Sequence, residues 1–138
     1  MSGSKLLSCL RKRDLLNSDS VDTAEFINLG ARYLEEERIS DAVDYFEKAG
    51  YQEGLTQVLE LCLTEGDYFL FTRLARILSL DPSPEQWTLL GDNALSQGKL
   101  LFARSAYQKA DLPEKLVQVE RLLNLPPQEQ THEKARLH

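Results

Sequence analysis

Two stretches of this chain share one pattern at a fixed separation of 61 residues. Residues 26–49 read FINLGARYLEEERISDAVDYFEKA, and residues 87–110 read WTLLGDNALSQGKLLFARSAYQKA. Each begins with a large aromatic residue, followed by a Leu-Gly pair, an Ala twelve residues after the Gly, an aromatic residue four later and an Ala three after that. Small residues are needed where two helices cross and large ones fill the gaps beside them, so each stretch predicts a helical hairpin.

This spacing resembles the tetratricopeptide repeat, in which an aromatic residue, a Leu-Gly pair, an Ala, a second aromatic residue and a second Ala follow in that order. Near-complete copies begin at Thr23 and Pro84, a degenerate copy begins at Gln52, and an incomplete copy begins at Pro113. These starts lie closer together than the roughly 34 residues of the family's repeat. The resemblance implies an all-α fold, a right-handed α-solenoid of stacked antiparallel hairpins with about eight helices.

Residues typical of helix ends place the individual elements. Helices are expected over the ranges 4–16, 22–37, 39–49, 52–65, 67–79, 84–97, 99–110 and 112–123. Asp22, Ser83 and Asp111 are expected to cap helix N-termini, because each is followed three residues later by Glu or Gln. Three glycines are expected to end helices in the left-handed conformation, namely Gly50, Gly66 and Gly98.

Composition divides the chain into an N-terminal capping helix and linker (1–21), the repeat domain (22–124) and a polar tail (125–138). The apolar residues of the first part would cover the terminal face of a helical stack. Alternatively, the basic run from Arg11 to Arg13 contacts an acidic partner or a membrane surface. No apolar run approaches the roughly 20 residues needed to cross a bilayer, and the N-terminus is too charged for a signal peptide. We therefore expect a cytoplasmic protein without membrane insertion.

Charge is concentrated in one half of the repeat domain. The chain has a net charge of −6, and residues 22–67 hold 12 Asp and Glu residues against three Lys and Arg residues. An acidic surface repels phosphate backbones, so nucleic-acid binding is not expected and a basic protein partner is favoured. The alternative is that these acids form a solvated outer face.

The residue types that carry catalysis are not arranged for it. The only two histidines, His132 and His138, lie in the tail, and Cys9 and Cys62 are 53 residues apart without a Cys-x-x-Cys pair. The glycines are scattered and form no phosphate-binding loop. We therefore expect a protein that is not an enzyme, with no cofactor, no metal site and two core thiols.

The resemblance also carries the functional prediction. It implies a non-catalytic protein–protein interaction module that binds a peptide or helix of a partner in a groove lined by the first helix of each repeat. The groove residues implied by the family's positions are Ile27, Ala31, Leu34, Glu35, Thr56, Glu60, Leu63, Thr88, Asp92 and Leu95. None is Lys, Arg or Asn, so the clamp with which tetratricopeptide co-chaperones hold the acidic C-terminus of heat-shock chaperones is not expected.

The alternative is a structural scaffold or self-associating element of a larger assembly. The segments KAGYQEGL (48–55) and KADLPEKL (109–116) resemble the endings of helix-pair repeats in vesicle-coat and intraflagellar-transport subunits. The predicted helix over 112–123 has no following repeat, so its apolar side is either exposed or covered by the tail or by a second copy. This alternative predicts a homodimer.

Overall fold

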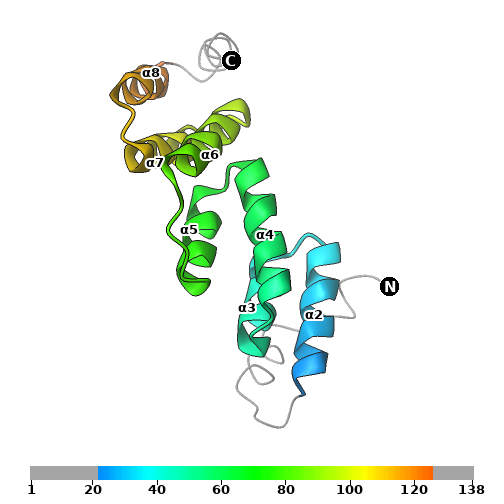
Figure 1. The fold of residues 1–138 in the computed structure, drawn as a ribbon. Helices are drawn as coiled ribbons and strands as arrows, with labels where there is room; N and C mark the ends of the chain where they lie inside the picture. Colours follow the sequence, from blue (N-terminus) through cyan, green and yellow to red (C-terminus); the bar gives the residue numbers. More distant parts are fainter. Residues whose placement is uncertain (1–21, 126–138) are drawn as a thin grey trace. The chain divides into compact units, whose positions relative to one another are not determined.

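The computed structural model describes residues 22–125, and every regular element in that range is an α-helix. In chain order the helices are α2 (Thr23–Glu35), α3 (Ile39–Ala49), α4 (Gln52–Glu65), α5 (Tyr68–Ile77), α6 (Pro84–Ser96), α7 (Leu100–Ala110) and α8 (Pro113–Leu123) (Figure 1). The all-α prediction is confirmed, and these helices end within two residues of the predicted ranges. The predicted helix over residues 4–16 lies outside the described residues.

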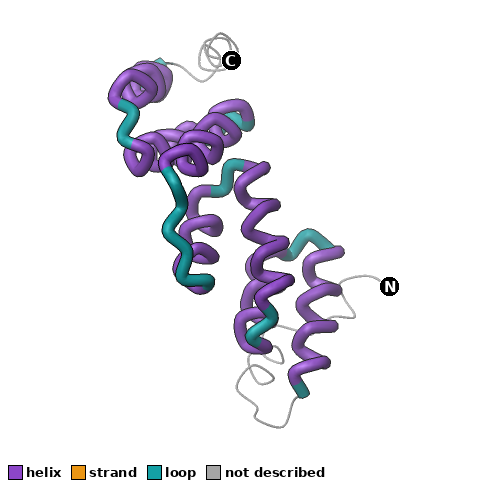
Figure 2. The backbone as a smooth tube through the Cα atoms, viewed as in Figure 1, coloured by secondary structure: helices purple, strands orange, loops and turns teal. Residues whose placement is uncertain are grey.

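The helices belong to two compact units. Residues up to Val58 form the first unit and residues from Leu59 onward form the second, so that the boundary falls within α4. Most connections between helices are short, and Figure 2 shows the longest described loop between α5 and α6. None of the helices between residues 22 and 125 is long and apolar enough to cross a membrane.

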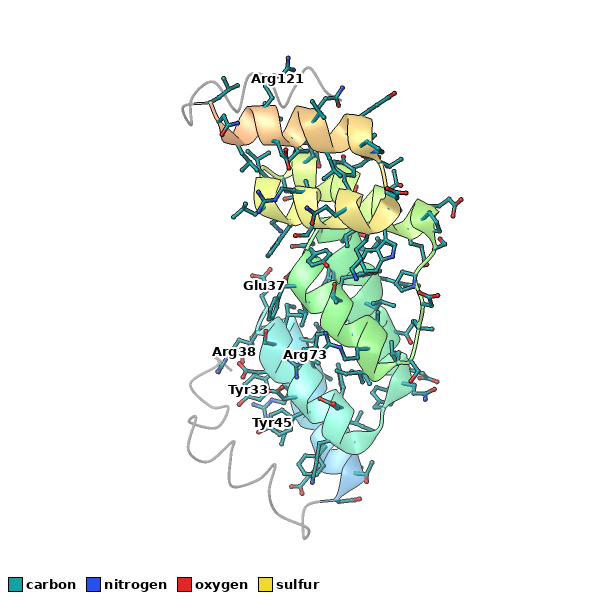
Figure 3. The ribbon with its side chains drawn as sticks, turned by 90° about the vertical axis from the view of Figure 1, so that its left-hand side faces the viewer. Tyr33, Glu37, Arg38, Tyr45, Arg73 and Arg121 are labelled. Atoms are coloured by element: carbon teal, nitrogen blue, oxygen red, sulfur yellow. The ribbon has the colours of Figure 1, made fainter. Side chains whose placement is uncertain are left out.

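The first unit contains a hairpin of α2 packed against α3. Tyr33 of α2 and Tyr45 of α3 are fully buried, and their rings stack with centroids 5.4 Å apart. The Arg38 guanidinium lies over the Tyr33 ring, 4.8 Å from its centroid, and Figure 3 shows the three side chains near one another. Burial, followed by the neighbouring Tyr33, raises the pKa of Tyr45 well above its usual value, so its hydroxyl stays protonated at neutral pH.

The second unit contains the corresponding hairpin, α6 packed against α7. In each hairpin an aromatic ring lies against a glycine of the facing helix. A Cβ atom on Gly30 would lie 2.5 Å from Phe46 Cε1, and a Cβ atom on Gly91 would lie 2.5 Å from Tyr107 Cε1. The two small residues predicted at the helix crossings are both fully buried, namely Ala42 and Ala103. The two stretches therefore build their hairpins with the same close contacts.

Further contacts surround the second hairpin. The end of α4 is held by α6, because Asn93 Nδ2 donates a 2.8 Å hydrogen bond to the Leu63 carbonyl oxygen. Lys99 Nζ donates another, also 2.8 Å long, to the Glu65 carbonyl oxygen. The α5 side chain Phe71 packs edge-on against the Trp87 ring of α6, with centroids 5.5 Å apart. The buried residues that join α6, α7 and α8 are Ala94, Leu95, Leu100, Ala103, Tyr107, Val119 and Leu122.

Two of the predicted N-terminal caps are confirmed and one is wrong. Ser83 Oγ accepts a hydrogen bond from the Gln86 amide, while Gln86 Oε1 accepts one from the Ser83 amide. Asp22 accepts from the Ala24 amide at 3.5 Å. Asp111 instead ends α7 with a φ of 58°, and α8 begins after Leu112 without a side-chain cap. Asp111 occupies the position that Gly50, with a φ of 64°, holds at the end of α3.

The turn after α2 offers a direct test of the 61-residue correspondence. Glu37 has a φ of 61°, whereas the corresponding turn after α6 carries Gly98 with a φ of 77°. A side chain in this left-handed region costs free energy that glycine avoids. We expect Glu37→Gly to raise the free energy of unfolding by about 1 kcal/mol and Gly98→Glu to lower it by a similar amount. Urea unfolding followed by circular dichroism measures both, and a loss of stability in Glu37→Gly would contradict the correspondence.

Candidate functional site

Four of the predicted groove residues lie along one side of α2. Ala31 and Glu35 are exposed, and Ile27 and Leu34 are half-buried. Ala24, also exposed, extends the row by another turn, because residues three, four and seven apart share one side of a helix. We call these five residues the α2 stripe.

The α2 stripe is separate from the side of α2 that holds the hairpin together. That side buries Phe26, Gly30 and Tyr33. The hairpin therefore keeps its own core contacts without using the exposed alanines, and the apolar atoms of the stripe remain accessible. The result is a narrow row of small and medium apolar side chains that ends at a carboxylate.

The predicted residues on α4 divide between the two units. Thr56 belongs to the first unit and is exposed. Glu60 and Leu63 belong to the second unit, where Glu60 is exposed and Leu63 is half-buried. The carbonyl oxygen of Leu63 accepts the hydrogen bond from Asn93 described above, so its backbone serves the packing of α4 on α6.

Asp92 of α6 lies in a polar network that the sequence did not predict. Its Oδ1 atom accepts hydrogen bonds from Tyr107 Oη at 2.6 Å and from Lys115 Nζ at 2.7 Å. The Lys115 ammonium also lies 5.3 Å from the centroid of the Tyr107 ring. These three residues come from α6, α7 and α8, so the Asp92 network ties the three helices together. The ion pair between Lys115 and Asp92 is exposed enough to contribute only roughly 0–1 kcal/mol to the free energy of unfolding. Its main effect is to fix the positions of the three side chains relative to one another.

Tyr107 is the buried member of the Asp92 network. Burial first, and then the bond to Asp92, raise the pKa of its hydroxyl well above the usual value. The hydroxyl therefore keeps its proton and donates to the carboxylate throughout the physiological pH range. At the 61-residue offset the first unit has Ala31, Phe46 and Gly54, from α2, α3 and α4, in place of these three residues. The joint change from small or apolar residues to Asp, Tyr and Lys is the sequence signal that could have revealed the network.

The other two predicted residues of α6 do not form an open surface. Leu95 is only 4% exposed and belongs to the core that joins α6, α7 and α8, so its assignment to a groove is wrong. Thr88 is half-buried and donates a 2.8 Å hydrogen bond to the Pro84 carbonyl oxygen of its own helix. The predicted groove residues therefore keep an apolar, accessible character on α2 but not on α6.

The described residues offer little reactive chemistry. Cys62 is buried, and burial, with a smaller contribution from the Asp67 and Glu65 carboxylates, raises the pKa of its thiol to about 12. Such a thiol is protonated at neutral pH and is a poor nucleophile. Between residues 22 and 125, no group of three or more His, Cys, Asp and Glu side chains is placed to hold a metal ion. Cys9, His132 and His138 lie outside the described residues.

Comparisons with protein families, with curated proteins and with solved structures find no match for this chain. The interpretation of the α2 stripe therefore depends on its residues, their exposure and their charge.

Proposed function

We propose that this chain is a non-catalytic protein–protein interaction module and that its α2 stripe binds a peptide or helix of a partner protein. The proposal includes the tetratricopeptide-like solenoid expected from the repeat, in which the first helix of each hairpin lines the binding surface. The partner presents an apolar row with Lys or Arg beside it. The chain itself supplies recognition and no reaction chemistry.

The observation that supports this proposal most is the accessible apolar row on α2. Ala24 and Ala31 are small enough to let a partner backbone approach closely, and the half-buried Ile27 and Leu34 provide contact area beside them. Burial of apolar surface contributes about 25 cal/mol per Å² to association, before the entropic costs of binding are subtracted. At the 61-residue offset, α6 has Glu85, Thr88 and Asp92 instead of Ala24, Ile27 and Ala31. The apolar row is therefore particular to the first hairpin and is not required for building such a hairpin.

Electrostatics favour a basic partner for the same surface. Residues 22–58 contain nine Asp and Glu residues and three Lys and Arg residues. Glu35 ends the α2 stripe, and Glu36 and Glu37 follow directly. A concentration of one sign of charge steers a partner of the opposite sign and raises its association rate.

Charge reversal on the stripe is expected to slow association more than the same change elsewhere on the hairpin. We expect Glu35→Lys to slow association with the partner recovered from native lysate by about tenfold. Glu47→Lys, which changes an exposed residue of α3, is the matched control and should have a much smaller effect. Surface plasmon resonance at low and physiological salt measures both rates, since screening acts over about 8–10 Å. Equal effects of the two variants, or rates that do not depend on salt, would contradict the electrostatic part of the proposal.

A structural role is the second candidate function. It is favoured by large hydrophobic side chains that the second unit exposes, among them Phe69 at 72% and Val117 at 67%. Such residues are common at contacts between subunits. Sedimentation velocity over a wide concentration range distinguishes the two functions, because a scaffold of this kind associates with itself and a monomeric interaction module does not.

A further inference from the structure

A second surface, distinct from the α2 stripe, lies at the N-terminal end of α7. It is a shallow depression of about 400 Å³ lined by Gly98, Lys99, Leu100, Leu101, Phe102 and Leu123. Leu101 is 57% exposed at its edge. Phe102 and Leu123 are partly buried and pack against the core that joins α6, α7 and α8. We call this surface the α7 depression.

The first hairpin shows that the apolar character of the α7 depression is not needed to start the helix. At the 61-residue offset, Ser40 and Asp41 of α3 stand where α7 has Leu101 and Phe102. Asp41 supplies an acidic residue to the first turn of α3 and forms a 2.9 Å ion pair with Arg38. Neither helix start has a side-chain cap, but the first turn of α7, unlike that of α3, contains no acidic residue. A helix start favours polar and acidic residues, so an exposed Leu is not what the start of a helix requires at this position.

We propose that the α7 depression docks an acidic amphipathic segment of a partner protein. The apolar side chains of that segment lie against Leu101, Phe102 and Leu123, and its carboxylates face Lys99. The segment thus supplies from outside both the apolar cover and the acidic charge that α7 lacks.

Charge complementarity selects an acidic occupant. Residues 98–125, which form α7, α8 and their connections, contain five Lys and Arg residues and three Asp and Glu residues. The balance is opposite to that of residues 22–58. Lys99 lines the α7 depression itself, and its ammonium, which donates one hydrogen bond to the Glu65 carbonyl oxygen, has two further N–H donors. The start of α7, which has no side-chain cap, adds the positive potential of a helix N-terminus.

Other segments of this chain fit the α7 depression less well. Among the described residues of the first unit, no large hydrophobic side chain is exposed, and Ile27 and Leu34 of the α2 stripe are half-buried. The acidic hairpin of a second copy therefore offers no projecting apolar side chain that could enter the depression. Two α7 depressions that face each other would bring together two Lys99 ammonium groups and two helix N-termini, all of them positive, which would repel one another. Residues 126–138 contain only Ala135 and Leu137 as non-proline apolar residues, and residues 1–21 carry the basic run from Arg11 to Arg13. A foreign segment that combines apolar and acidic side chains therefore matches best.

Panning a random peptide display library against the full chain tests this proposal. We expect the enriched peptides to combine Leu, Ile or Phe with Asp or Glu. Leu101→Ser introduces the residue that the first hairpin has at this position. It should weaken binding of these peptides by about tenfold, the loss typical of a removed apolar contact. The thermal midpoint of the Leu101→Ser variant should be equal to or higher than that of the wild type. Val117→Ser removes an apolar side chain of α8 that lies outside the depression and is 67% exposed, against 57% for Leu101, and it should leave binding unchanged.

Several results would overturn the proposal. One is that the enriched peptides include none with acidic residues. Another is that Leu101→Ser and Val117→Ser weaken peptide binding equally. The third is that no peptide is enriched. Binding that develops only after residues 126–138 are deleted would instead assign the α7 depression to the chain's own tail. A dimer in sedimentation velocity that Leu101→Ser dissociates would assign it to a second copy. The α2 stripe is present in the same experiment, but its proposed partners carry Lys or Arg and should bind Leu101→Ser as well as the wild type. Failure to enrich acidic peptides that Leu101→Ser weakens would therefore leave the proposed function intact.

Discussion

Replacing Gly66 with Ala is expected to lower the free energy of unfolding by about 2–5 kcal/mol. Gly66 has a φ of 69°, and a Cβ atom there would lie 2.4 Å from both the Cα and the backbone nitrogen of Ala94. The substitution therefore combines an unfavourable backbone conformation with a clash against backbone atoms that no side-chain rotation can relieve. Urea unfolding followed by circular dichroism measures the loss.

Gly50→Ala is the matched control for this experiment. Gly50 has nearly the same φ, 64°, but a Cβ atom on it would meet nothing within 4 Å. Only the conformational cost remains, about 1–2 kcal/mol. The difference between the two variants isolates the close approach of the turn after α4 to α6. If both variants lost the same stability, the contact between Gly66 and Ala94 would be absent in solution.

The second large effect is expected at the crossing of α6 and α7. Ala103 is fully buried there, so Ala103→Leu forces the two helices apart and should lower the free energy of unfolding by about 1–3 kcal/mol. Ala31→Leu makes the same change at an exposed position of α2 and should alter stability by less than about 0.5 kcal/mol. Differential scanning calorimetry compares the two midpoints. An unchanged midpoint for Ala103→Leu would mean that Ala103 does not lie at the crossing.

The features that the sequence predicted correctly are local or repeated. The helix ranges follow from apolar periodicity and from caps such as Ser83 with Gln86, where both hydrogen bonds join residues three apart in the chain. The burial of the two alanines follows from the repeat, because a pattern that occurs twice marks positions under the same steric demand. Burial of Ala42 and Ala103 could therefore be predicted without any knowledge of neighbouring helices.

The predictions from sequence fail where a residue type suits two structural roles, or where helices distant in the chain determine whether a side chain is buried or bonded. Asp111 has the side chain of an N-terminal cap, but the turn between α7 and α8 needs a left-handed residue, and Asp tolerates that conformation. Leu95 fits a groove by its position on α6, yet it joins the core that α7 and α8 complete. The Asp92 network depends on Lys115, 23 residues further along the chain, so local spacing does not reveal it and only a residue-by-residue comparison of the two copies could have done so.

Site-specific photo-crosslinking at the α2 stripe tests the central claim most directly, that this surface binds a partner protein. A photoreactive amino acid placed at Ala31 reports on contacts of the stripe, and the same amino acid placed at Lys48, an exposed position of α3, serves as the control. Both variants are irradiated in native lysate, and the adducts are separated by mass. The account predicts one defined adduct from position 31, reduced by Glu35→Lys, and none of that mass from position 48. Equal adducts from both positions, or none from position 31, would contradict it.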